Sequence, residues 1–71
     1  MTVTEAEADH LMAIWARADA AADAAHEVGD AGALRVAVNV ATAAQDLLEA
    51  IYPHGPPEWL RLKYIEAAGR A

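Results

Sequence analysis

Two long stretches of the chain place apolar residues at alternating intervals of three and four. In the first stretch these positions are Leu11, Ile14, Ala18, Ala21, Ala25 and Val28. In the second they are Leu34, Ala37, Ala41, Ala44, Leu48 and Ile51. This spacing is typical of helices that pack along a single seam. We therefore predict an all-α domain with two long helices, at about residues 5–28 and 33–52.

The residues that flank both stretches are typical of helix ends. Thr4 and Glu7 fit a capping box, in which the threonine oxygen accepts a backbone hydrogen bond and the glutamate reaches back. The turn sequence at 29–32, Gly-Asp-Ala-Gly, tolerates left-handed backbone and predicts the end of the first helix. Pro53 ends the second helix, because proline cannot continue the hydrogen-bond ladder.

The two apolar series match each other when the chain folds back on itself. Val28 then meets Leu34 at the turn, and Leu11 meets Ile51 at the open end, with alanine opposite alanine between them. Small side chains let two helices approach more closely than the usual 8 to 10 Å. The sequence therefore predicts an antiparallel, alanine-seamed helical hairpin.

The second predicted helix carries an apolar stripe that this seam does not use. The stripe consists of Val36, Val40, Ala43 and Leu47. An exposed stripe of this kind marks a partner surface, and the simplest partner is a second copy, which would give a homodimer built as a four-helix bundle. The alternative is that the third helix of the same chain folds over the stripe.

A short third helix is predicted at about residues 57–68, because proline suits its first position and Glu58 suits its positive end. It combines aromatic and basic residues, which are enriched at interaction hot spots. The candidates for binding a partner are Trp59, Arg61, Leu62, Lys63 and Tyr64. Its most readily buried face consists of Leu60, Tyr64, Ala67 and Ala68. A competing expectation is that Trp59 packs against the large-residue end of the hairpin, near Trp15, Leu48 and Tyr52.

Composition and charge narrow the possible functions. The 71 residues include 20 alanines, lack cysteine and serine, and carry a formal net charge of −6. These absences exclude a disulfide scaffold, a cysteine-based zinc module and a serine or cysteine nucleophile. The acidic balance argues against direct binding to nucleic acid or to a membrane. An alanine-rich core buries little surface per residue, which favours oligomerisation.

Two acidic clusters are candidates for metal binding, and we expect neither to bind one. The first comprises Asp19, Asp23, His26 and Glu27, which lie away from the predicted seam. The second comprises Glu5, Glu7, Asp9 and His10, which suit the positive end of a helix. His54 follows a proline and has no evident orienting partner. We therefore expect no catalytic, cofactor-binding or metal site.

The leading hypothesis is a cytoplasmic, non-enzymatic interaction module. It would self-associate through the second helix and present its acidic first helix or its third segment to another, unidentified protein. The alternative is a phage-type acidic decoy that binds a basic host protein by imitating nucleic-acid charge, since residues 1–30 carry seven carboxylates and one arginine. A third possibility is a small metal-dependent helical hydrolase. The preference for alanine, arginine and glycine suggests a GC-rich genome, such as that of an actinobacterium or its phage.

Overall fold

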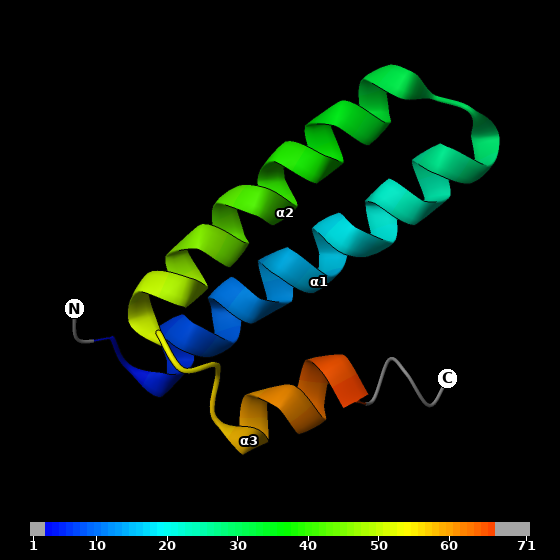
Figure 1. The fold of residues 1–71 in the computed structure, drawn as a ribbon. Helices are drawn as coiled ribbons and strands as arrows, with labels where there is room; N and C mark the ends of the chain where they lie inside the picture. The colour runs from blue at the N-terminus through cyan, green and yellow to red at the C-terminus, as the bar shows by residue number, and fades with distance from the viewer. Residues whose placement is uncertain (1–2, 67–71) are drawn as a thin grey trace.

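A computed structural model describes residues 3–66 as two long antiparallel helices and a short third element (Figure 1). Helix α1 (Glu5–Val28) and helix α2 (Ala31–Ile51) form the hairpin. Helix α3 (Glu58–Leu60) continues as a π-helical segment, η1 (Arg61–Glu66), and η1 packs against α1 near the open end of the hairpin. The predicted all-α hairpin with a short third helix is confirmed.

The ends of the two long helices are stabilised by local side chains. The Thr4 Oγ1 accepts a hydrogen bond from the Glu7 backbone N–H at 3.1 Å, and the Glu7 carboxylate accepts one from the Thr4 N–H at 3.2 Å. Gly29 ends α1 in the left-handed conformation, with φ of 74°. Asp30 then caps α2 by accepting a hydrogen bond from the Ala33 N–H at 3.0 Å.

The turn of the hairpin is shorter than the sequence suggested. We predicted that residues 29–32 form the turn and that the second helix begins at about residue 33. In the structure the turn is confined to Gly29 and Asp30, and α2 begins at Ala31. The reason is that Asp30 acts as the N-cap of α2, so the two residues after it already belong to the helix.

Alanine residues form the middle of the seam between α1 and α2, as predicted. The buried members are Ala18, Ala25, Ala37 and Ala44, none of them more than 7% exposed. Two predicted seam residues are exposed instead: Ala21, and Val28 at 79%. Val28 is the last residue of α1, and the turn beside it offers no further layer to pack against. Ala21 borders a hollow between the helices.

The larger side chains form a small core at the open end of the hairpin. Its buried members are Ala8, Met12, Leu48 and Leu60. Half-buried side chains pack around them, namely Val3, Leu11, Trp15, Tyr52 and Tyr64. Leu60 is completely buried, whereas Trp59 is 39% exposed. Leu60, and not Trp59, is therefore the residue of the third element that joins this core, because adjacent helical residues point in different directions.

The third element also differs in detail from the predicted helix at about 57–68. Pro57 is the N-cap, so the helix begins at Glu58, and the backbone widens to π-helical geometry from Arg61. Ala67 and Ala68 lie outside the described residues. Within residues 3–66, no helix combines the length and the apolar character needed to cross a bilayer.

Candidate interaction surfaces

The stripe predicted on the second helix is exposed along one side of the hairpin. Val36, Val40 and Leu47 are 64%, 43% and 50% exposed, and Ala43 is also exposed. The third element does not cover the stripe, because η1 packs against α1 and Leu60 joins the core on the other flank of the seam. Among the described residues, the alternative of a third helix folded over the stripe is therefore wrong.

Two hollows run beside the stripe, between α1 and α2. The hollow nearer the turn has a volume of about 580 Å³, and its lining includes Ile14, Arg17, Ala21, Ala33, Val36 and Val40. The hollow nearer the open end has a volume of about 500 Å³ and is lined by Val3, Ala6, Glu7, His10, Leu11, Leu47 and Ile51. We call the stripe and these two hollows together the hairpin groove.

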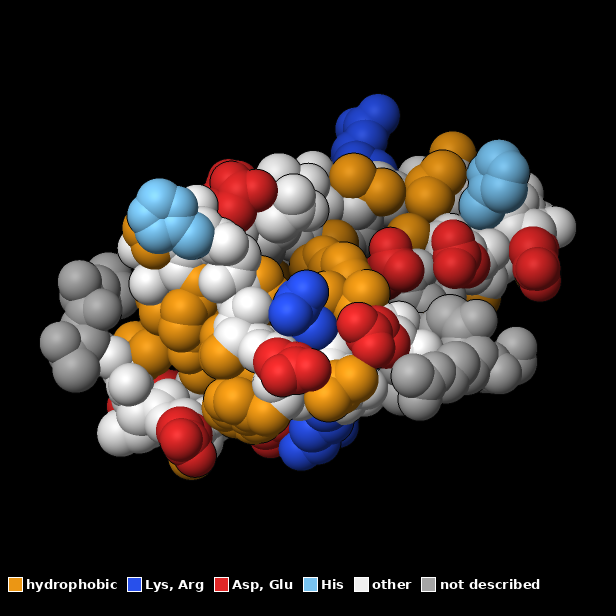
Figure 2. Space-filling model, turned by 60° about the horizontal axis from the view of Figure 1, so that its bottom comes forward, with side chains coloured by type: hydrophobic (Ala, Val, Ile, Leu, Met, Phe, Trp, Pro, Cys, Tyr) orange, Lys and Arg blue, Asp and Glu red, His pale blue; other side chains and the backbone are white. Residues whose placement is uncertain are grey.

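The hairpin groove is poor in charge, although the protein is acidic. Its titratable lining residues are Glu7, His10 and Arg17. Helical periodicity places Asp23 on the side of α1 opposite Ile14, which lines the groove. Figure 2, viewed from the side that carries α3, shows several acidic side chains on that side. Two hairpin grooves can therefore face each other without bringing Asp23 of one copy close to Asp23 of the other.

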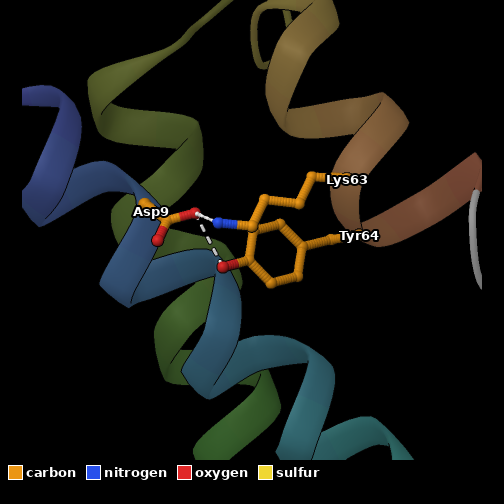
Figure 3. A network of polar contacts seen from close by, with 3 residues as sticks. All are labelled: Asp9, Lys63 and Tyr64. Carbon is orange, nitrogen blue, oxygen red and sulfur yellow. Dashed lines mark hydrogen bonds and ion pairs between the residues drawn. The ribbon is translucent and has the colours of Figure 1, made fainter.

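A polar network holds the third element on α1 (Figure 3). The Lys63 Nζ and the Tyr64 hydroxyl both donate hydrogen bonds to the Asp9 Oδ1, at 2.8 Å and 2.7 Å. The Lys63 Nζ also lies 5.3 Å from the centre of the Tyr64 ring, within reach of a cation–π interaction. We call this network the Asp9 tie, and it joins residues more than fifty positions apart in the sequence.

The Asp9 tie changes the acid–base behaviour of its three members. The hydrogen bonds donated first by Lys63 and then by Tyr64 lower the pKa of Asp9. The hydrogen bond to Asp9 raises the pKa of Lys63. The hydrogen bond to Asp9 and, secondarily, burial raise the pKa of Tyr64. Each shift favours the state in which the aspartate is charged and both donors keep their protons.

Of the five partner-binding candidates of the third element, two form contacts within the protein and three are exposed. Lys63 and Tyr64 are engaged in the Asp9 tie. Trp59 and Leu62 are 39% and 43% exposed, and Arg61 is exposed. Those three remain available to a partner without any change in the fold, whereas binding through Lys63 or Tyr64 would compete with Asp9.

The acidic and histidine residues considered as metal ligands stay on the surface. Asp19, Asp23, His26 and Glu27 are exposed along α1. In the second cluster, Glu7 belongs to the capping box and Asp9 to the Asp9 tie. His54 is exposed in the segment before α3. Within residues 3–66, no three or more histidine or carboxylate side chains are grouped in a way that would hold a metal ion.

The structure also forms a pocket that no pattern in the sequence indicates. It lies between α1, α2, the 53–56 segment and η1, with a volume of about 490 Å³. Its lining consists of Met12, Trp15, Gln45, Leu48, Glu49, Tyr52, Pro53, Gly55, Pro56 and Ile65. We call it the aromatic pocket. The residues of α2 that line it, Gln45, Leu48 and Glu49, share one side of the helix, but only the fold of the third element closes the other wall.

No protein-family model matches the chain, and no curated protein or solved structure shows significant similarity to it.

Proposed function

We propose that this chain is a non-enzymatic assembly module of the cytoplasm that forms a homodimer through the hairpin groove. One observation carries the proposal. Among the described residues, eight large hydrophobic side chains are exposed, whereas the buried core contains three that are larger than alanine. Three of the exposed ones, Val36, Val40 and Leu47, lie along one side of α2. Covering them would supply the apolar burial that the monomer lacks.

A second copy fits the hairpin groove in size and in charge. The molecule measures 38 × 27 × 19 Å, and a second copy of the same length can lie along the whole hairpin. Two hairpins packed groove to groove place four long helices around one core, as in a four-helix bundle. The small number of charged side chains in the groove keeps the electrostatic cost of pairing two acidic molecules low.

Two glutamate substitutions on α2 test this proposal. Val40 and Val38 are 43% and 45% exposed, but only Val40 lines the hairpin groove. We expect V40E to be a 7.5 kDa monomer, because it places a carboxylate inside the interface, and we expect V38E to remain dimeric. Light scattering over a wide concentration range measures both masses, and circular dichroism verifies that each variant is folded.

Two results would contradict the proposal. One is a wild-type mass of 7.5 kDa that does not change with concentration. The other is equal dissociation by V38E and V40E, which would show that added negative charge, and not its place in the groove, weakens the dimer.

The acidic side of α1 supports a second candidate function, the binding of a basic protein. Asp19, Asp23 and Glu27 are exposed there, at intervals of four. As an acidic decoy, the module would use these carboxylates in place of nucleic-acid phosphates. Binding to basic proteins from the host should then weaken with added salt and should be lost in a D19N/D23N variant. Binding that is insensitive to salt would count against this candidate.

A further inference from the structure

We propose that the aromatic pocket binds a small aromatic amine, with its ring inside the pocket and its ammonium group beside Glu49. The pocket is distinct from the hairpin groove and is formed with residues of the third element. Figure 2 shows hydrophobic side chains gathered at the end of the molecule where α3 lies.

The size and the lining of the pocket suit a single ring with a short side chain. Its volume of about 490 Å³ is within the range of about 300 to 1,000 Å³ typical of small-molecule sites. The lining is largely apolar and includes the half-buried side chains of Trp15 and Tyr52. Aromatic side chains favour stacked or edge-to-face contacts with a ligand ring.

The charge of the lining determines which kind of ring compound is favoured. Glu49 is the only charged side chain among the lining residues, and Gln45 is the only neutral amide. The Gln45 Nε2 donates a hydrogen bond to the Glu49 Oε1 at 3.2 Å, which orients the carboxylate without neutralising it. A ligand ammonium can therefore pair with Glu49, and the Trp15 and Tyr52 rings attract a cation as well. A ligand carboxylate would be repelled.

The pocket can be occupied whether or not the protein dimerises. On α2 it uses Gln45, Leu48 and Glu49, whereas the hairpin groove uses the stripe on the other flank of the seam. The wall contributed by Ile65 belongs to η1, which the Asp9 tie holds against α1. A protein that is found to be monomeric would therefore leave this proposal intact. A protein that does not bind the amine would likewise leave the proposed homodimer intact.

Titration with 2-phenylethylamine tests the proposal, with 3-phenylpropionate as a ligand of similar shape and opposite charge. In a W59F background Trp15 is the only tryptophan, so its fluorescence reports occupancy of the pocket. We expect the amine to change this fluorescence with saturation and to bind at least about fivefold more tightly than the acid. Added salt should reduce the difference.

A matched pair of variants tests whether the Glu49 carboxylate is the charge that binds the amine. E49Q removes the carboxylate from the pocket, and we expect it to weaken binding of the amine about threefold to fivefold. D46N removes the same charge from an exposed position on α2 that does not line the pocket, and it should leave binding unchanged. Circular dichroism verifies that both variants keep the helical fold. Equal binding of amine and acid, equal losses in E49Q and D46N, or no saturable response to the amine would overturn the proposal.

Discussion

Truncation of Leu60 tests whether one side chain docks the third element onto the hairpin. Leu60 is completely buried, and it packs with Ala8, Met12 and Leu48 from both long helices. Leu62, two positions further on, is 43% exposed and gives a matched control for the same substitution. L60A should therefore destabilise the protein strongly, and L62A should hardly affect it.

The size of the effect follows from the burial of the two side chains. Replacing a buried leucine by alanine costs about 2 to 5 kcal/mol, because transfer free energy is lost and a cavity remains. A domain of this length has a total unfolding free energy of roughly 4 to 10 kcal/mol. L60A should thus remove about half of the stability, whereas truncation of the exposed Leu62 should cost no more than about 0.5 kcal/mol.

Urea denaturation followed by circular dichroism measures both free energies of unfolding. The comparison is made at a single protein concentration, because dimerisation would make the apparent stability depend on concentration. A loss below about 1 kcal/mol for L60A, or losses of equal size for the two variants, would refute the assignment of Leu60 as the docking residue.

Two further predictions concern the Asp9 tie and the hairpin turn. The lowered pKa of Asp9 means that its stabilisation is present above its unfolded-state pKa and is lost as the pH falls through the folded-state value, below about pH 4. The raised pKa values of Lys63 and Tyr64 mean that their contributions are lost as the pH rises above about 10. Thermal unfolding across this pH range should show both losses of stability in the wild type, whereas D9N should lack the stabilisation by the Asp9 tie at every pH. Identical pH profiles of the melting temperature for the wild type and D9N would contradict the prediction. At the turn, G29A should lower the free energy of unfolding by about 1 kcal/mol, because φ is 74° there and alanine disfavours the left-handed region. G32A should instead raise it by about 0.5 kcal/mol, since Gly32 is helical and an added Cβ would meet no atom closer than 3.7 Å; a shift of the same sign in both variants would contradict this reasoning.

The apolar stripe on α2 was predictable from the sequence, but whether the fold leaves it exposed was not. Helical spacing alone placed Val36, Val40, Ala43 and Leu47 on one side of the helix. Whether the third element covers them depends on the segment at 52–57, which contains three prolines and carries the chain to the other flank of the seam. Both flanks of the seam present apolar residues, so hydrophobic patterning did not favour one over the other.

Hydrophobic patterning also does not decide whether Trp59 or Leu60 is the core residue of the third element. Both are apolar, and both can reach the open end of the hairpin. The rotation of α3 about its own axis decides which one is buried, and that rotation is coupled to contacts with Met12 and Leu48. It also brings Lys63 and Tyr64 to Asp9. No pattern along the sequence identifies a pair of opposite charges so far apart in the chain.

The sequence is sufficient for the features that depend on neighbouring residues: the two long helices, the capping box at Thr4, the stop at Gly29 and the apolar face of each long helix. These features follow from hydrogen bonds and side-chain periodicity within a few turns of one helix. Tertiary structure alone decided which flank the third element covers, that Leu60 is buried, and that the aromatic pocket forms. Those outcomes depend on the packing of elements that are distant in sequence, where several apolar surfaces compete and the geometry of a short connection selects among them.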